Sequence, residues 1–544
     1  MLEFKFNSKK TIVGFNTGHH GGCCIIHKNK IIAIAEERLN RKKYSEGYLY
    51  SLFYCLKELN ISIYDIDLFV SSSYHKELPK KFQGDLNLLG LDKNKFISVD
   101  HHLSHAYSSY FLSSFNDAII IVIDGLGNNF DTESYYLAKN NLIKKIGGNN
   151  TSRSIYKGIG RTYETFTNFC GWSAQEAGKT MGLASYGKDK YPKIQLYSMN
   201  KKEQIESLVE GKYYQASLNF IKEKRLNFGK PFSSYSNKNA AYFVQNRTEK
   251  IIIELINRLY KKYKVENLCL AGGVFLNSIL NQKILDQTEI KNLFIPACCD
   301  DTGQAFGNAL YGFHKYYKNN KIYALPHSYL GREYTEEEIL DVLNKEQNIF
   351  VLPYEVKSKS FKFKKCKDIC KETAELLVKG NIIGWFQGGS EIGPRALGHR
   401  SILCAPFPIK MKQILNSKIK HREAFRPFAP SILKNYLSEY FEMENDSPFM
   451  LRVAKTKKPM WNKVPAIMHI DKTARVQTVT SKNNGIYYKL IKNFYKISGI
   501  PLVLNTSFNN SGEPIVETPK DAMVMFCKTQ MDYLVMGDYL IWKE

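Results

Sequence analysis

Two stretches of the sequence repeat one pattern of strands and turns, and this repetition constrains the fold more than any other feature. The first, TIVGFN-TGHHGG-CCIIH-KNK-IIAIAEE, predicts a strand, a glycine turn, a strand, a Lys-Asn turn and a third strand. The second, DAIIIVIDGLGNNFDTESYYLAKNNLIKKI, follows the same order, and Asn16 and Asp124 occupy matching strand ends. Predicted helices at 47–60 and 101–115 separate the two units. We therefore expect a duplicated α/β domain with a cleft between its halves.

This plan resembles the architecture shared by actin, sugar kinases and Hsp70 (ASKHA), whose strand-turn-strand loops hold nucleotide phosphates. A third glycine turn, LCLAGGVFLNSILNQKIL, follows an apolar strand and opens a helix, where backbone N–H groups favour an anion. The Lys-rich stretch 345–375 is expected to be a solvated linker and helix face. A second α/β domain begins at NIIGWFQGG and continues past PLVLNTSFNN. The expected domains are residues 1–345 and 346–544.

Composition excludes several classes of protein. With 44% apolar residues the chain can form packed cores, and no stretch approaches the roughly 18 apolar residues of a membrane span. The first residues lack a signal-peptide core, and the eleven cysteines lack the spacing of a disulfide framework or zinc module. We expect a soluble cytoplasmic protein.

The net charge of +25 suggests a nucleic-acid partner, but the residue types weaken that interpretation. Of the 77 basic residues only 14 are Arg, and the lysines are spread evenly, as on a solvated surface. No nucleic-acid or membrane partner is expected. Six of the Arg residues lie between positions 395 and 475, where a planar guanidinium suits phosphate or carboxylate: Arg395, Arg400, Arg422, Arg426, Arg452 and Arg475.

The segment VDHHLSHAYSSYF indicates a metal site. His101 and His105 are four residues apart, so on a helix they share one face and can chelate one ion. Asp124, in IVIDGLG, and Asp301, in PACCDDTGQAFG, supply carboxylates. Asp300 is the alternative, and Asp301 is preferred because it directly precedes a turn that opens a helix. Mixed nitrogen and oxygen ligands suit Fe(II), Mn(II) or Zn(II) better than Ca(II).

The turn TGHHGG places two histidines among small residues that leave room for a ligand. A neutral His19 can accept a proton from a substrate hydroxyl. His20 is the alternative, and an ordinary turn histidine explains either equally well.

Two motifs of the second domain gather charged residues around Gly and Pro turns. They are Glu391, Arg395, His399 and Arg400 in GGSEIGPRALGHRS, and Lys420, Arg422 and Arg426 in KHREAFRPFAPS. Such Arg pairs fit a phosphate or phosphoanhydride, with Glu391 assisting Mg(II), whereas surface ion pairs are the competing explanation. Asn505 follows the strand PLVL, at a strand end where polar groups commonly line a site.

In this order the motifs resemble the NodU/CmcH family of O-carbamoyltransferases along nearly the whole chain. The motifs are GFNTGHHGGCC, AEERLNRKKY, VDHHLSHAYSSYF, VIDGLG, EAGKTMGLASYG, LAGGVFLNSIL, PACCDDTGQAFGNAL, GWFQGGSEIGPRALGHRSIL, FRPFAPSIL, ARVQTV and VLNTSFNNSGEPIVETPKDA. The resemblance implies an actin-like N-terminal domain and a YrdC-like α/β C-terminal domain. It also implies that carbamoyl phosphate and ATP give carbamoyl adenylate in the C-terminal domain, and that the N-terminal domain transfers the carbamoyl group to a hydroxyl of a sugar or natural product.

The resemblance assigns roles residue by residue. His19 would be the general base, and the ligands of iron(II), the metal reported for the family, would be His101, His105, Asp124 and Asp301. Carbamoyl phosphate or ATP, with Mg(II), would contact Glu391, Arg395, Arg400, Arg422, Arg426, Arg475 and Asn505. Carbamoyl adenylate would contact Lys179, Gly272, Gly273 and Asn277. The identity of the acceptor is not indicated, and a homodimer is left open.

Two departures from the family pattern stand out. The family commonly has His-Asp-x-Ser-Ala where this chain has His19-His20-Gly21-Gly22-Cys23, which puts the acceptor side in doubt. Gly389 follows FQG where the family commonly has Arg or Lys, which puts one anion contact in doubt.

Three other functions compete with the carbamoyltransferase interpretation. A tRNA threonylcarbamoyl transferase would share HxxxH and the glycine turns, but the second domain argues against it. A non-haem iron oxygenase would need neither the paired glycine turns nor the Arg-rich domain. A non-catalytic sugar- or nucleotide-binding protein would function without its histidine pair.

Overall fold

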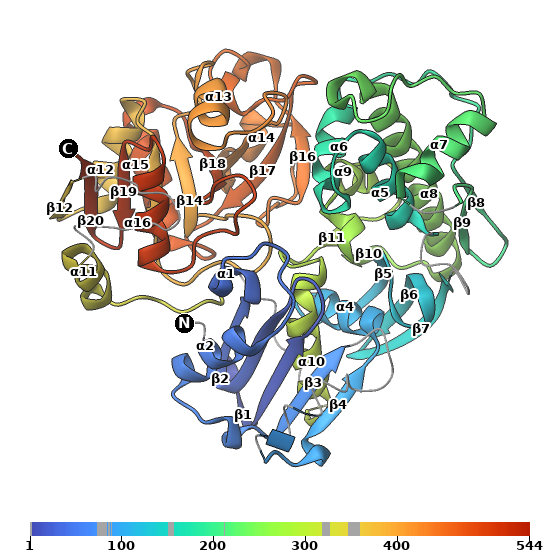
Figure 1. Cartoon of the computed structure of the whole chain (residues 1–544), viewed down its shortest axis with the longest axis horizontal. Helices are drawn as coiled ribbons and strands as arrows, with labels where there is room; N and C mark the ends of the chain where they lie inside the picture. The colour runs from blue at the N-terminus through green and yellow to red at the C-terminus, as the bar shows by residue number, and fades with distance from the viewer. Residues whose placement is uncertain are drawn as a thin grey trace. The chain divides into compact units, whose positions relative to one another are not determined.

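The computed structural model divides the chain into two compact units. It describes residues 3–72, 84, 87–88, 90–150, 157–210, 213–317, 327–345 and 360–544. The N-terminal unit comprises Glu3–Lys30 and Glu46–Leu325, and the C-terminal unit comprises Met1–Leu2, Ile31–Ser45 and Pro326–Glu544. Figure 1 colours the chain from its N-terminus to its C-terminus.

Two sheets in the N-terminal unit share an order of four strands, to which the second sheet adds one edge strand. Their strand orders are β2-β1-β3-β4 and β7-β6-β5-β10-β11, and in each sheet antiparallel pairing is followed by two parallel pairs. The strands are β1 (Glu3–Asn16), β2 (Gly22–Ala35), β3 (Leu68–Ser72), β4 (Phe96–Val99), β5 (Asp117–Ile123), β6 (Asp131–Lys139), β7 (Leu142–Asn150), β10 (Asn267–Ala271) and β11 (Asn292–Phe294). The repeated order confirms the α/β fold class and agrees with an actin-like plan.

One predicted turn is absent from the first repeat. Asn140 and Asn141 form the expected turn between β6 and β7, both with positive φ. In the first repeat, by contrast, β2 continues through Lys28, whose φ is 53°. Near the end of β2, the N–H of Ala33 donates to the carbonyl of Leu330 at 3.0 Å. A strand with an external partner does not need to fold back as a hairpin.

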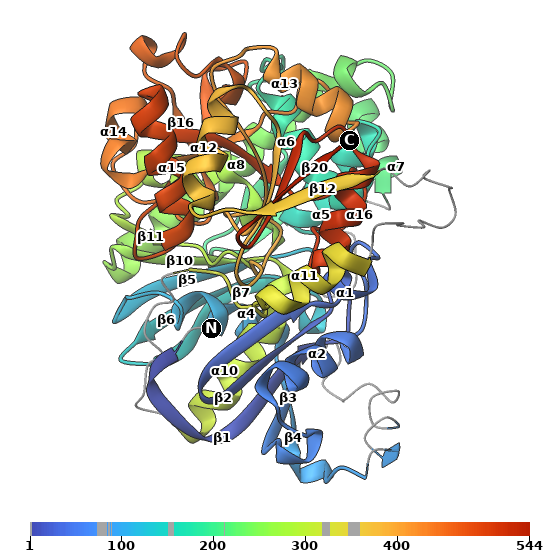
Figure 2. The same ribbon diagram turned by 90° about the vertical axis from the view of Figure 1, so that its left-hand side faces the viewer.

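Two helices of this unit, α4 (His101–Tyr110) and α10 (Gln304–Tyr316), pack against these sheets, and most of the others pack against one another. The other helices are α2 (Leu49–Leu59), α5 (Ile159–Phe169), α6 (Ala177–Ala184), α7 (Tyr213–Glu223), α8 (Lys238–Tyr263) and α9 (Ser278–Gln287), and a small hairpin joins β8 (Tyr197–Met199) to β9 (Ile205–Ser207). Figures 1 and 2 show α10 running along β1 and β3. Gly307 lets α10 approach α4, because a Cβ there would lie 2.1 Å from the carbonyl oxygen of Ser104.

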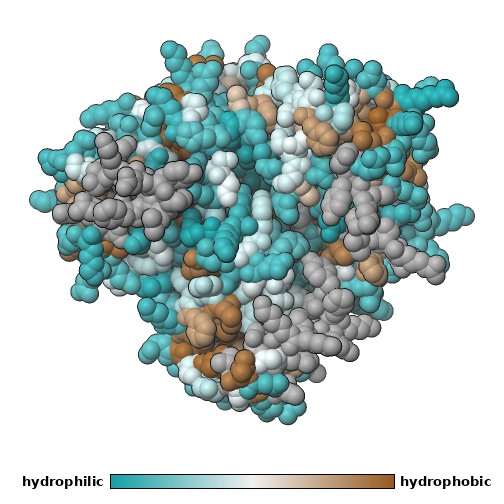
Figure 3. Space-filling model, in the orientation of Figure 1, coloured by the Kyte–Doolittle hydropathy of each residue, from teal (hydrophilic) through white to brown (hydrophobic). Residues whose placement is uncertain are grey.

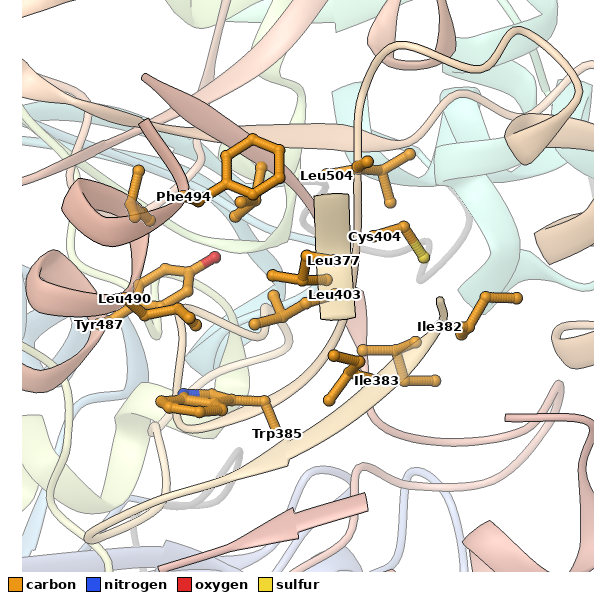
Figure 4. Packing of buried hydrophobic residues seen from close by; sticks show 14 of the residues in the cluster. Leu377, Ile382, Ile383, Trp385, Leu403, Cys404, Tyr487, Leu490, Phe494 and Leu504 are labelled. Atoms are coloured by element: carbon orange, nitrogen blue, oxygen red, sulfur yellow. The ribbon is translucent and has the colours of Figure 1, made fainter. Parts of the chain in front are cut away.

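The C-terminal unit is built on a nine-stranded sheet with the order β12-β20-β19-β13-β14-β18-β15-β17-β16. Its strands are β12 (Phe361–Lys365), β13 (Ile383–Phe386), β14 (Arg400–Cys404), β15 (Ala429–Leu433), β16 (Arg452–Lys455), β17 (Thr473–Val479), β18 (Leu502–Ser507), β19 (Tyr533–Met536) and β20 (Tyr539–Lys543). Its helices are α1 (Glu36–Asn40), α11 (Glu336–Lys345), α12 (Ile369–Val378), α13 (Met411–Ile414), α14 (Leu437–Tyr440), α15 (Gly485–Ser498) and α16 (Pro519–Lys528). Figure 4 shows its core, where Trp385 and Tyr487 pack among Leu, Ile and Phe side chains.

The compact units divide the chain differently from the predicted boundary at residue 345. Ile339 and Leu343 of α11 are buried in the core of the C-terminal unit, so α11 packs with the residues that follow it. Of the predicted linker 345–375, residues 346–359 lie outside the described residues, whereas Phe361–Lys365 form β12. The assignment of one catalytic step to each domain stays a prediction.

The described surface is mainly hydrophilic on the face shown in Figure 3. Several lysines form exposed ion pairs, such as that of Lys10 with Asp67 at 2.9 Å. All eleven cysteines are free thiols, as their spacing predicts. Within the described ranges, no helix combines the length and the apolarity that crossing a membrane requires.

Candidate functional site

Helix α4 presents the predicted histidine pair on one buried face. The helix begins directly after Asp100, whose side chain accepts a hydrogen bond from the N–H of Leu103 at 2.9 Å and so caps the first turn. His101 and His105 are 2% and 0% exposed, and both turn Nε2 toward the ends of β5 and of the loop before α10. The HxxxH spacing therefore has the geometry predicted for it.

Asp124 stands at the end of β5 and is held by two glycine turns. Its Oδ1 accepts hydrogen bonds from the N–H groups of Gly125 at 2.7 Å and Gly273 at 3.3 Å. Its Oδ2 is thereby directed toward the histidines, 3.3 Å from His101 Nε2 and 3.1 Å from His105 Nε2.

Two adjacent aspartates in the loop before α10 have different partners. Asp300 caps the short 3-10 turn Asp301–Gly303 by accepting hydrogen bonds from the N–H and hydroxyl of Thr302, and it lies 3.6 Å from His20 Nδ1. Asp301 Oδ1 lies 3.3 Å from His101 Nε2 and 3.2 Å from His105 Nε2. The preference for Asp301 over Asp300 as the carboxylate that joins the histidines therefore agrees with the geometry.

Four donor groups thus form a buried His2Asp2 cluster. The ligand atoms of His101, His105, Asp124 and Asp301 all lie within 4.8 Å of one another. Burial lowers the pKa of both imidazoles, but the Asp301 charge and hydrogen bonds to both carboxylates outweigh it and raise the pKa of His101 to about 10. Burial likewise opposes ionisation of Asp301, yet the histidines hold its pKa well below the usual range.

This cluster can hold a divalent cation. Two carboxylates and two neutral imidazoles carry a net charge of −2, which a divalent ion balances in place of the two imidazole protons. The mixed nitrogen and oxygen donors, buried and convergent, fit Fe(II), Mn(II) or Zn(II).

The two histidines of the TGHHGG turn lie beside this cluster. His19 Nε2 is 3.1 Å from Asp301 Oδ2, the carboxylate oxygen that faces away from His105, and the His19 side chain is 50% exposed. His20 has a φ of 58° and is largely buried against Asp300. Of the two, His19 is therefore the one that solvent or a substrate can reach.

The other residues predicted for the N-terminal unit line the third glycine turn and a nearby helix. Gly272 has a φ of 98°, and a Cβ there would meet the carbonyl oxygen of Ile123 at 2.1 Å, so this position needs glycine. Asn277 caps α9 and pairs with Gln245 through two side-chain hydrogen bonds of 2.8 and 3.0 Å. Lys179 lies on α6 and pairs with Glu176 at 2.7 Å.

In the C-terminal unit, four guanidinium groups gather close enough to repel one another. Burial, followed by the charges of Arg395, Arg422 and Arg426, lowers the pKa of Arg475 far below its usual value. Burial and the neighbouring Arg426 lower the pKa of Arg422 to about 9. Glu423 lies 3.8 Å from Arg426. Such concentrated positive charge is an anion-binding arrangement.

Lys420, which the sequence places in one motif with Arg422 and Arg426, also belongs to this cation cluster. Its ammonium is 3% exposed and donates to Ser507 and to both side-chain and backbone oxygens of Asn509 at 2.8 Å. Burial and then the charges of Arg422 and Arg426 lower its pKa far below the usual value.

The loop that carries Arg395 is fixed from several sides. Glu391 Oε1 accepts hydrogen bonds from three loop N–H groups at 2.8–3.1 Å, those of Leu397, His399 and Arg400. Asn505 donates to the carbonyl of Ala396 at 3.2 Å from beneath the loop. Glu391 and Asn505 therefore shape the loop, and direct contact of either with a ligand stays a prediction.

Arg400 and Gly389 both lie close to backbone carbonyl groups. The Arg400 guanidinium is fully buried, stacks on Phe386, and donates to the carbonyls of Gln387 at 2.7 Å and Gly388 at 2.9 Å. A Cβ at Gly389 would lie 2.2 Å from the carbonyl oxygen of Gly331, which explains why this chain has no larger residue there. Direct contact of Arg400 with a bound anion stays a prediction.

Comparison with known proteins connects both units to one family. The family description "Carbamoyltransferase N-terminus" matches residues 71–310, and "Carbamoyltransferase C-terminus" matches residues 374–543. The chain is 32% identical over 563 residues to the nodulation protein NolNO of Sinorhizobium fredii, covering 97% of this chain and 79% of that protein. It is 32% identical over 545 residues to protein MJ1051 of Methanocaldococcus jannaschii, covering 98% and 99%.

More distant similarities were also found. Nodulation protein U of Sinorhizobium fredii is 24% identical over 560 residues, covering 92% of this chain and 94% of that protein. A crystal structure of full-length HypF aligns with 57% of this chain and 56% of its own, with 14% identity and a TM-score of 0.38. The two family models match consecutive parts of the chain, and relatives are 32% identical over nearly its full length. This chain therefore belongs to the NodU/NolO-type carbamoyltransferase family and is a carbamoyltransferase.

Proposed function

We propose that this enzyme is an ATP-dependent O-carbamoyltransferase that works in two steps. Carbamoyl phosphate, water and ATP first give carbamoyl adenylate, phosphate and pyrophosphate. A hydroxyl of a sugar or other natural product then attacks the carbamoyl carbon, and the bond from that carbon to the AMP oxygen breaks. AMP leaves with the electron pair, and the hydroxyl proton goes to a base.

The cation cluster of the C-terminal unit carries this proposal. Carbamoyl phosphate and the triphosphate of ATP are polyanions, and their reaction requires positive charge that is already in place before they bind. Four half-buried arginines, Arg395, Arg422, Arg426 and Arg475, and the buried Lys420 supply that charge. Mg(II) would enter as the counter-ion of ATP.

The His2Asp2 cluster and His19 support the transfer step in the N-terminal unit. When bound there, Fe(II), or alternatively Mn(II) or Zn(II), supplies a Lewis acid for the carbamoyl carbonyl. Asp301 Oδ2, accepting the Nε2–H of His19, orients the ring and leaves Nδ1 as the basic nitrogen that takes the hydroxyl proton. Lys179, Gly272, Gly273 and Asn277 remain the residues proposed to hold carbamoyl adenylate.

A product assay tests the proposal. Purified enzyme, supplied with ATP, Mg(II) and carbamoyl phosphate, is expected to release pyrophosphate only when carbamoyl phosphate is present. With an accepted hydroxyl compound it is expected to release AMP and to add the mass of one CONH group to that compound. Pyrophosphate release that is absent, or that does not depend on carbamoyl phosphate, would overturn the adenylate mechanism.

A further inference from the structure

A short N-terminal segment is part of the C-terminal unit. Residues Ile31–Ser45, which contain helix α1 and the motif AEERLNRKKY, cluster with residues that follow position 326. The segment contributes two of the fourteen Arg residues of the chain, Arg38 and Arg41. Both reach backbone carbonyls more than 350 residues away in the sequence.

Arg38 holds the loop that carries Arg395. Its side chain is 2% exposed, and its Nη2 donates to the carbonyl of Gly393 at 3.0 Å and to that of Glu391 at 3.3 Å. The Glu391 carboxylate fixes the other end of the same loop through the three N–H groups described above. Gly393 is two residues from Arg395, so the Arg38 guanidinium fixes the backbone of the loop close to Arg395.

Arg41 holds the loop behind Lys420. Its Nη1 and Nη2 donate to the carbonyls of Ile515 at 2.7 Å and Pro514 at 2.8 Å. The preceding residue, Glu513, accepts a hydrogen bond of 2.7 Å from the side chain of Asn509, and Asn509 in turn accepts from Lys420. A continuous chain of contacts therefore leads from Arg41 to the buried ammonium.

We propose that Arg38 and Arg41 are positioning residues of the C-terminal anion site, so that the segment Ile31–Ser45 completes this site from the other end of the chain. The inference rests on the proposed function, because it takes the cation cluster as the site of the phosphate donor. Neither residue touches the donor. Arg38 fixes the loop that carries Arg395, and Arg41 fixes the segment whose Asn509 accepts a hydrogen bond from Lys420. A displacement of about 1 Å at a binding group can cost up to 100-fold in rate.

The experiment compares conservative variants of the full-length enzyme. Arg38→Lys and Arg41→Lys keep the charge but replace a planar group that spans two carbonyls by a single ammonium. Both are expected to raise the KM for carbamoyl phosphate about tenfold in the pyrophosphate-release assay, with kcat changed less than about twofold. The matched control is Arg247→Lys, because Arg247 is also buried and donates to the carbonyls of Ile194 and Tyr191, in the N-terminal unit.

A purely structural role would give a different result. If Arg38→Lys and Arg41→Lys lower the melting temperature but leave the KM at the value of Arg247→Lys, the inference is wrong. Should one variant fail to fold, the other decides the question. Should the wild-type enzyme release no pyrophosphate, the proposed function fails, and calorimetric binding of inorganic phosphate then tests the inference: phosphate affinity about tenfold weaker in both variants supports it, and unchanged affinity overturns it.

Discussion

At the scale of single residues, Asp301 joins the His2Asp2 cluster to the exposed His19. One oxygen faces His101 and His105, and the other faces His19 at 3.1 Å. Asp301→Asn is therefore expected to lose the metal and to slow carbamoyl transfer by about 100-fold or more. Metal content by plasma mass spectrometry and AMP release with an accepted hydroxyl compound would measure the two effects.

Asp300→Asn is the matched control, since Asp300 is the adjacent buried carboxylate and serves Thr302 and His20 instead. It is expected to keep the metal. The opposite pattern, with metal lost from Asp300→Asn and retained in Asp301→Asn, would show that the ligand set is wrong.

Arg475 illustrates a conflict between stability and binding. Burial and three neighbouring guanidinium groups disfavour its charge, as its strongly lowered pKa indicates. Arg475→Gln should therefore raise the unfolding free energy of the ligand-free protein by about 1 kcal/mol while raising the KM for carbamoyl phosphate at least about tenfold. Thermal unfolding and steady-state kinetics would measure these changes.

The control for Arg475 is Arg452→Gln. Arg452 is buried and donates to two backbone carbonyls at 3.2 and 3.4 Å. Its replacement should destabilise the fold and leave the KM unchanged. Loss of stability in Arg475→Gln, or an unchanged KM, would contradict the account of the cation cluster.

Residue-level prediction from the sequence succeeded where spacing is local. His101 and His105 share a helical face because they are four residues apart, and Asp124 ends a strand that is apolar throughout. Arg38 escaped prediction because its partners, the carbonyls of Glu391 and Gly393, are backbone groups far along the chain. Contacts to carbonyls leave no side-chain pattern for a sequence to reveal.

At the scale of elements, the close packing of α4 on α10 sets the geometry of the histidine pair. Gly307 of α10 faces the backbone of Ser104, which lies between the two histidines, and a Cβ there would lie 2.1 Å from the Ser104 carbonyl oxygen. Gly307→Ala is expected to push the helices apart and to weaken metal affinity roughly 10- to 100-fold, although Gly307 touches no ligand. Metal titration of the stripped protein would measure it.

Gly178→Ala on α6 is the control for Gly307. No atom lies within 4 Å of a Cβ at Gly178, so alanine there should be neutral or slightly stabilising. Equal metal affinity in the two variants would show that helix spacing does not control the site.

Strand β6 carries a buried carboxyl that should make stability depend on pH. Burial raises the pKa of Glu133 from its ordinary value of 4.5 to about 7. The folded protein therefore binds a proton that the unfolded chain releases between these values, and stability falls as pH rises from about 5 to about 7. Relative to Glu133→Gln, the wild type should lose roughly 2 kcal/mol of unfolding free energy between pH 5 and pH 8.

Urea unfolding at the two pH values would test this, with Glu206→Gln on the exposed face of β9 as a control that should track the wild type. If the unfolding free energy changed by the same amount with pH in the wild type and in Glu133→Gln, the prediction would be wrong.

The element pattern of the sequence predicted the repeated strands but misjudged one turn. The repeated strand-turn-strand pattern corresponds to two sheets that share an order of four strands, and the Asn140-Asn141 turn forms as expected. In the first repeat β2 continues through the Lys-Asn segment, and the N–H of Ala33 further along the strand donates to the carbonyl of Leu330. Local propensity cannot register a partner that comes from 300 residues downstream.

At the scale of the whole molecule, the predicted boundary at residue 345 and the compact units differ for the same physical reason. The segment Ile31–Ser45 and helix α11 precede that boundary, yet their buried side chains and backbone hydrogen bonds belong to the C-terminal unit. Composition shifts mark linkers in a sequence, but they do not reveal a segment that packs non-locally. The proposed two-step mechanism assigns the cation cluster to the C-terminal unit and the His2Asp2 cluster to the N-terminal unit.

The most direct test of that mechanism separates the two steps by their metals. The enzyme is stripped of its resident metal by chelation, dialysed and supplied with excess Mg(II), and both steps are then assayed on the same sample. Pyrophosphate release dependent on carbamoyl phosphate should persist. AMP release in the presence of a hydroxyl acceptor should disappear, and it should return when Fe(II), Mn(II) or Zn(II) is added. Loss of both steps together, or transfer that survives removal of the metal, would contradict the assignment of the His2Asp2 cluster to the transfer step.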